Sequence, residues 1–205
     1  MWGLVEDNVI TKIINKPKGL VIGDVRHSRK IFELWSEEEL NNIGIYSVVF
    51  DNSNKKDEAY YNNTNQTFAY ADGAVTASYG SATAKALADT LFTAQDEIDG
   101  KGTEGEVASK GLKSQKKSIV KQQAAGILQD TDWYITRKAD AGTAVPSAVT
   151  THRAAVRTKS GEMETAIDNA ADVDALAALY EYVNTGTEEN PVMERPLGEF
   201  PVLEV

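Results

Sequence analysis

The chain has 205 residues, with 31 acidic and 21 basic side chains and a net charge of −10, which argues against a large nucleic-acid-binding surface. It contains no cysteine, so disulfide bonds and thiolate metal sites are excluded. No apolar run approaches the roughly 18 residues that cross a bilayer, and Glu6, Asp7 and Asn8 interrupt any signal-peptide core, so we expect no membrane partner.

Two stretches of the N-terminal half predict β-hairpins. Between Trp2 and Ile14, the aliphatic pairs Leu4-Val5 and Val9-Ile10 flank a short polar cluster that suits a tight turn. Further along, aromatic and apolar residues recur at every second position on both sides of Asp72-Gly73. This dipeptide favours a type I′ turn because both central positions need a positive φ.

One short helix is expected between the two hairpins. Ser36 with Glu39 three residues later forms a capping box, and Gly44 stands where a left-handed cap would end the helix. The alternation over residues 46–50 predicts a half-buried strand, and the polar stretch 51–67 predicts a surface loop.

From Thr83 onward the hydrophobic residues recur at helical spacing. The pattern predicts a helix from Thr83 to about Ile98, a break at residues 99–102, a second helix over about 110–128, a third that begins at Pro146, and a last one from Val173 to Val183. In the second helix, Lys110, Lys113, Lys117 and Lys121 lie opposite the apolar stripe. This arrangement is typical of a solvated face, and binding to phosphate or to an acidic partner is the alternative.

These patterns indicate an α+β protein. We expect a β-rich N-terminal domain, 1–82, with short hairpins and one small helix, and then a helical hairpin or bundle, 83–186. An extended C-terminal tail, 187–205, contains Phe200 and Leu203 among several apolar residues. The tail either docks on a neighbouring protein, as an added strand or in a groove, or packs back on its own helices.

No set of side chains indicates catalysis. Only His27 and His152 are available as bases, and neither lies in a recognisable nucleophile turn. Acid pairs such as Asp130 with Asp132 lie where caps and solvated helix faces favour carboxylates. Residues 100–102 lack the spacing of a phosphate-binding loop. We therefore expect no enzymatic activity, no cofactor and no metal.

The large aromatic residues allow two interpretations. Trp133 and Tyr134 directly follow an acidic pair at the end of the second helix. The rings either form a hydrophobic plug between the second and third helices or face another subunit, because a Trp usually dominates whichever core or interface holds it. Trp2 and Trp35 carry the same two interpretations in the β-rich half.

Two stretches resemble bacteriophage tail proteins. Residues 128–133 (Leu-Gln-Asp-Thr-Asp-Trp), Pro146 and residues 151–157 (Thr-His-Arg-Ala-Ala-Val-Arg) are similar to a C-terminal module shared by phage tail fibre proteins and small tail assembly chaperones. That module has an aliphatic pair before Thr/Ser-Asp-Trp, a proline-containing break, and then Tyr-Arg-x-x-Leu/Val-Arg. His152 stands where Tyr is usual, and this chain continues past the module's normal end. Residues 32–49 resemble a small N-terminal module of the same proteins.

The resemblance implies a non-enzymatic structural protein of the virion, in the tail or associated with a tail fibre and made in the host cytoplasm. Its partners would be other phage structural proteins and further copies of itself. One alternative is a tail assembly chaperone that is absent from the mature particle, and another is an adhesin that binds host glycans. The candidate interface or packing anchors are Trp2, Trp35, Trp133, Tyr134, Arg153, Arg157, Phe200 and Leu203.

Overall fold

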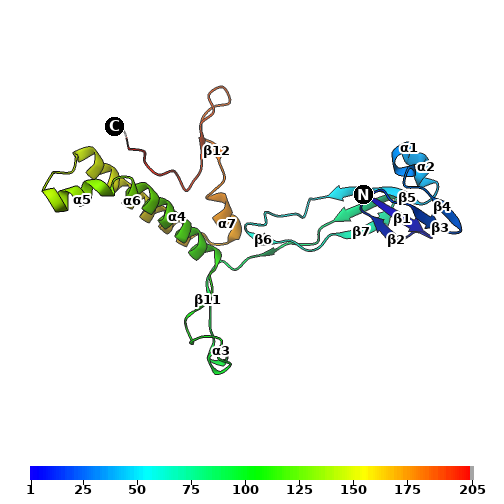
Figure 1. Ribbon diagram of the computed structural model, residues 1–205, viewed down its shortest axis with the longest axis horizontal. Coiled ribbons are helices and arrows are strands. Elements are labelled where there is room, and N and C mark those ends of the chain that lie inside the picture. Colours follow the sequence, from blue (N-terminus) through cyan, green and yellow to red (C-terminus); the bar gives the residue numbers. More distant parts are fainter. Residues whose placement is uncertain (204–205) are drawn as a thin grey trace. The chain divides into compact units, whose positions relative to one another are not determined.

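The computed structural model describes residues 1–203, and its helices and strands are traced in Figure 1. The fold is α+β, as predicted, with short strands in the N-terminal half and the long helices in the C-terminal half. The chain divides into two compact units, Met1–Thr83 and Ala84–Val205. Residues 204 and 205, the last two of the predicted tail, lie outside the described residues.

The first unit is built on a five-stranded sheet in the order β2-β1-β5-β8-β7. Only the β5–β8 pair is parallel among the pairings within this sheet that the structure describes. Both predicted hairpin turns are confirmed, because Asp7, Asn8, Asp72 and Gly73 all have a positive φ. The strands are β1 (Trp2–Glu6), β2 (Val9–Ile14), β5 (Ile45–Asp51), β7 (Thr67–Ala71) and β8 (Ala74–Ser78).

One hydrophobic cluster fills the space between this sheet and two short helices. The helices are α1 (Ile31–Leu34) and α2 (Glu37–Asn41), and a small hairpin of β3 (Leu20–Ile22) and β4 (Val25–His27) precedes them. Strands β1, β2, β3 and β5 and both helices each contribute one buried side chain, which explains why such short elements are stable only together. These side chains are Leu4, Ile14, Leu20, Ile31, Leu40 and Ile45. Two further short strands of this half are β6 (Tyr61–Asn62) and β9 (Thr83–Ala84).

The predicted capping box of α2 is confirmed. The Ser36 backbone N–H donates to Glu39 Oε2 at 2.7 Å, and the Glu39 N–H donates to Ser36 Oγ at 3.2 Å. The Ser36 backbone N–H, followed by its hydroxyl, holds the pKa of Glu39 below its ordinary value. The helix ends at Asn41, and Gly44, three residues later, has a φ of 80°, the left-handed conformation predicted for it.

Gly44→Ala is expected to destabilise the first unit more than Gly73→Ala does. Both glycines have a φ near 80°, but a Cβ on Gly44 would lie 2.5 Å from the Val5 carbonyl oxygen, whereas a Cβ on Gly73 would meet open space. We expect losses of more than about 2 kcal/mol for Gly44→Ala and about 1 kcal/mol for Gly73→Ala. Urea unfolding measures both, with the fluorescence of Trp2 and Trp35 read in a Trp133→Phe background. Equal losses would show that the approach to Val5 is unimportant.

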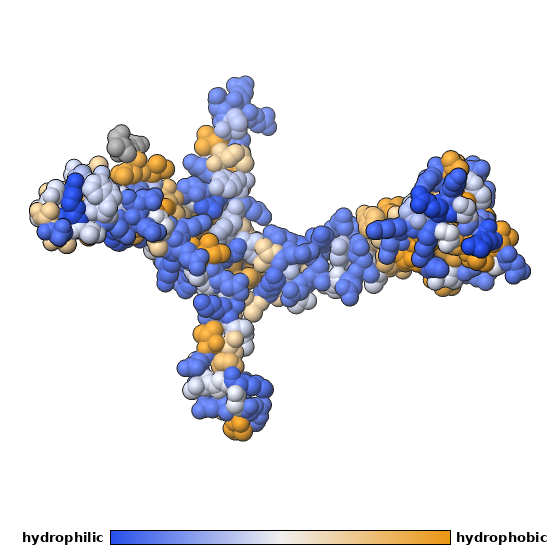
Figure 2. Space-filling model, viewed as in Figure 1, coloured by the Kyte–Doolittle hydropathy of each residue, from blue (hydrophilic) through white to orange (hydrophobic). Residues whose placement is uncertain are grey.

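The helix predicted from Thr83 to Ile98 is wrong. Strand β10 (Thr90–Leu91) pairs antiparallel with β11 (Val107–Ser109), and only α3 (Ala94–Ile98) between them is helical. A stripe at helical spacing stabilises a helix only if a core covers it. Here Leu91 is 49% exposed and Ile98 78% exposed, and Figure 2 shows hydrophobic surface on the segment that carries α3. Local capping therefore determines where α3 begins.

The N-terminal cap of α3 predicts a pH-dependent structure. The Thr93 backbone N–H, then its hydroxyl, and then Lys101 lower the pKa of Asp96 from 3.8 to about 2. A lowered carboxyl pKa stabilises the folded form above pH 3.8, and this contribution disappears as the pH falls toward 2. We expect the Thr93 amide resonance to titrate with a midpoint near 2, and Asp96→Asn to remove the titration. A midpoint near 4 would mean that the cap does not form.

The second unit is organised around two long helices, α4 (Leu112–Gln129) and α6 (Ser147–Asn169), which lie side by side in Figure 1. They are antiparallel, because residue 113 contacts residue 168 and residue 128 contacts residue 153. The apolar stripes meet and bury Val120 from α4 together with Val156, Met163 and Ile167 from α6. The short helix α7 (Val173–Ala178) adds Leu176, and its N-cap, Asp172, accepts a hydrogen bond from Ala175 N at 2.7 Å.

The lysines of α4 do not form a separate solvated face. Lys113 Nζ donates to the Asp168 carbonyl at 2.8 Å, Lys117 Nζ lies 2.8 Å from Asp168 Oδ1, and Lys121 Nζ lies 3.2 Å from Glu164 Oε2. These cations therefore border the α4–α6 seam, where partly exposed ion pairs contribute little stability but fix the alignment of the two helices.

The start of α4 is capped from a distance. Its N-cap is Gly111, which has no side chain, and the carboxylate of Asp89 takes over by accepting from Gly111 N at 2.7 Å and from Ser114 Oγ at 2.9 Å. The Gly111 N–H, followed by the Ser114 hydroxyl, lowers the pKa of Asp89. This cap fixes the preceding segment against the helix, with Leu112 N donating to Ala86 O.

The chain after α7 differs from the prediction. The helix ends at Ala178 rather than Val183, and β12 (Val183–Asn184) pairs with β13 (Met193–Glu194), so part of the predicted extended tail is a hairpin. Leu197 is then buried, and its N–H donates to Leu179 O at 3.0 Å. The segment therefore packs back on its own unit at this point.

Candidate interface at the turn between helices α4 and α6

A buried arginine fixes the turn between the two long helices. Arg153 of α6 is 8% exposed. Its Nη1 donates to the Leu128 carbonyl at 2.7 Å and to Thr131 Oγ1 at 2.6 Å, and its Nη2 lies 2.8 Å from Asp132 Oδ1. The guanidinium thus binds a carbonyl at the end of α4, which also accepts from the Thr131 N–H and hydroxyl, and an acid at the start of the next helix.

The next helix, α5 (Asp132–Ala141), was not predicted from the sequence, which suggested a break here. It begins directly after Thr131 and ends at Gly142, whose φ is 69°. None of its ten residues is buried. An isolated helix of this length is only marginally stable in water, and α5 buries none of its residues that could stabilise it by packing.

Trp133 is not the predicted plug between the long helices. Its side chain is on α5 and is 52% exposed. The Trp133 and Tyr134 rings lie 3.9 Å apart, and the guanidinium carbon of Arg137 lies 4.6 Å from the centre of the Trp133 ring. Stacking on a cation keeps these rings together on the surface. The Trp133 ring therefore lies at the surface of the helical unit, with the Tyr134 ring partly buried beside it.

The two tryptophans of the first unit differ from Trp133 and from each other. Trp2 is partly buried against the hydrophobic cluster, with its ring 4.7 Å from that of Phe32. Trp35 is 37% exposed and makes an edge contact with His27 at 5.8 Å. Trp2 is therefore a packing anchor, and Trp35 leaves one part of its ring open to solvent.

The remaining predicted anchors lie near the α4–α6 turn. Arg157 is exposed and its Nη1 donates to the Arg153 carbonyl at 3.3 Å, so it has no buried role like that of Arg153. Phe200 and Leu203 are partly buried and line a groove beside α4 and α6. His152, which the sequence analysis considered only as a possible base and as the residue in the usual Tyr position, is 8% exposed and lines the same groove. No sequence signal identified its burial.

Comparisons with known proteins add no further constraint, since no protein-family model, no curated protein and no solved structure matches this chain. Within residues 1–203, no group of three or more His, Asp or Glu side chains is placed to hold a metal ion. In the same residues, no helix combines the length and the apolar character that crossing a membrane requires.

Proposed function

We propose that this chain is a non-enzymatic structural protein of a bacteriophage tail or tail fibre, which acts through protein–protein interfaces in the particle. The observation that carries the proposal is the geometry of the stretch that resembles the tail module. Leu128, Thr131, Asp132 and Arg153 all belong to that stretch and form one hydrogen-bonded cluster at the α4–α6 turn. A motif whose residues contact one another is more informative than the same residues scattered over a fold.

The surface around this cluster supports a role in assembly. Trp, Tyr and Arg are the residues that most often dominate binding energy at interfaces, and the half-exposed Trp133 stacks with the partly buried Tyr134 and Arg137 beside the cluster. The helix that carries them has no buried residue.

Quantitative mass spectrometry of purified particles tests the proposal. Particles should be collected from the host that carries the gene and washed at high salt to remove adsorbed protein. A fixed ratio of this chain to the other tail proteins, retained through the wash, is the expected result. Absence from particles together with co-purification with tail proteins from the lysate would instead identify an assembly chaperone. Absence from both fractions would refute a role in the tail.

A further inference from the structure

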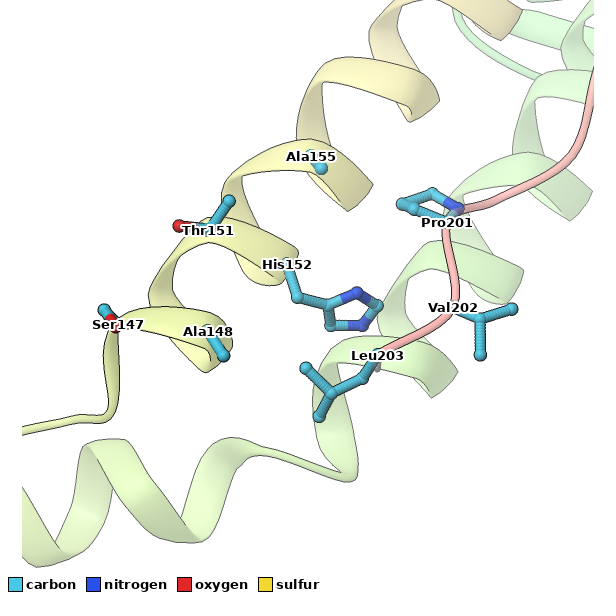
Figure 3. Close-up of a pocket in the computed structure, with 8 residues that line it drawn as sticks. All are labelled: Ser147, Ala148, Thr151, His152, Ala155, Pro201, Val202 and Leu203. Carbon is cyan, nitrogen blue, oxygen red and sulfur yellow. The ribbon is translucent and has the colours of Figure 1, made fainter. Parts of the chain in front are cut away.

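One side chain that lines a groove next to α5 has a buried polar atom without a hydrogen-bond partner. It lies between the end of α4, the start of α6 and the segment 200–203, and encloses a cavity of about 350 Å³. Ile127, Phe200, Pro201 and Leu203 make most of its lining apolar. Figure 3 shows an adjoining part of the groove, with the His152 ring projecting from α6 toward Pro201 and Leu203.

His152 marks the polar end of the groove. It is 92% buried, and its Nδ1 has no hydrogen-bond partner within the described chain. A buried nitrogen without a partner costs free energy, and with the ring proton on Nε2 this Nδ1 is an acceptor, so it favours an occupant that brings one N–H donor in an otherwise apolar group. The indole of tryptophan has this chemistry, with one donor and no acceptor. A cavity of roughly 150 Å³ already holds a benzene ring, so this groove is large enough for an indole.

The chain itself carries a matching side chain. Trp133 is 52% exposed and lies on α5, which follows directly after the α4 residues that line the groove. The charges beside ring and groove are also complementary. Arg137 stacks on Trp133, and its Nε has no hydrogen-bond partner within residues 1–203. Asp130 lines the groove, is exposed, and makes none of the ion pairs found in this part of the chain.

We propose that two copies of this chain pair about a two-fold axis, with Trp133 of each copy inserted in the groove of the other. The indole Nε1–H then donates to His152 Nδ1, and Arg137 of one copy pairs with Asp130 of the other. A two-fold interface uses the same patch on both copies, which requires a ring and its receiving groove to lie near each other on one chain. The pairing deepens the proposed function, on which it rests only for the premise that the protein acts through interfaces.

Sedimentation equilibrium of the purified full-length protein tests the pairing with two blocked variants. Trp133→Ala removes the ring but leaves the groove, whereas Ala148→Phe fills the groove from its exposed rim but leaves the ring. We expect a wild-type dimer, and a dissociation constant weakened at least about 30-fold in each variant alone. Ala154→Phe is the matched control, because Ala154 is exposed on α6 and does not line the groove. It should dimerise like the wild type.

Mixing the two blocked variants distinguishes exchange between copies from a contact within one chain. The mixture contains one intact ring and one intact groove on different chains, so a heterodimer should reappear. Trp133→Phe and His152→Leu should each weaken dimerisation about fivefold, and their combination should weaken it no further, since both remove one hydrogen bond. A monomeric wild type, a mixture that stays monomeric, or blocked variants that pair normally would each overturn the pairing. None of these results would alter the particle composition that tests the proposed function.

Discussion

Arg153→Ala is expected to lower the free energy of unfolding of the helical unit by about 3 kcal/mol. The substitution removes two hydrogen bonds and an ion pair that join α6 to the end of α4 and the start of α5. It also leaves Thr131, which is 3% exposed, without its cationic donor. Urea unfolding followed by far-ultraviolet circular dichroism measures the loss, because most of the helical residues belong to this unit.

Arg157→Ala is the matched control for this experiment. Arg157 lies one turn further along α6, is exposed, and donates one long hydrogen bond to a backbone carbonyl. Its removal should change stability by no more than about 0.5 kcal/mol. Arg153→Lys should recover only part of the loss, because an ammonium group cannot reproduce the forked geometry of the guanidinium. If both arginines gave equal losses, Arg153 would not be the residue that fixes the turn.

Met163→Ala and Trp133→Ala should have opposite effects on stability and assembly. Met163 is 1% exposed in the α4–α6 core, so its truncation should cost about 3 kcal/mol of unfolding free energy. Trp133 is half exposed, and its truncation should cost less than about 1 kcal/mol. For association the order reverses, because an exposed Trp stacked on Arg is typical of residues that dominate binding.

Competition during particle assembly measures the second half of this prediction. Wild-type and Trp133→Ala chains expressed together should enter purified particles in a ratio that favours the wild type by at least about 30-fold, whereas each chain alone should be soluble and folded. A Trp133→Ala chain that loses about 3 kcal/mol or more, the expected cost of truncating a core ring, would place Trp133 in the helical core.

Local sequence signals determined the elements whose stability is local. The turns at Asp7-Asn8 and Asp72-Gly73 require positive φ values, and the Ser36–Glu39 capping box forms within one helical turn, so each could be predicted without a fold. The α4 and α6 stripes were predicted correctly because each runs over several turns. When apolar residues repeat at helical spacing over several turns, an amphipathic helix is the only regular structure that places all of them on one face.

The incorrect predictions share one physical cause, because they concern structure that depends on contacts between residues far apart in the sequence. The spacing over 83–98 matches a helix, but no core covers it, and the Asp89 carboxylate instead caps α4 some twenty residues later. Helix α5 was missed because its start depends on Asp132 meeting Arg153. The sequence left both interpretations of Trp133 open, because it gives the size of the ring and says nothing of the side of the helix on which the ring lies.

The sequence by itself determined an α+β chain with β-hairpins followed by two long amphipathic helices, since periodicity and turn chemistry act between near neighbours. It also supplied the residues that carry the resemblance to tail proteins. Only the tertiary structure decided that Arg153 is buried, that Trp133 faces solvent and that His152 lines a groove without a polar partner. Burial depends on which surfaces meet across the fold, and that information is not encoded in the spacing of residues along one segment.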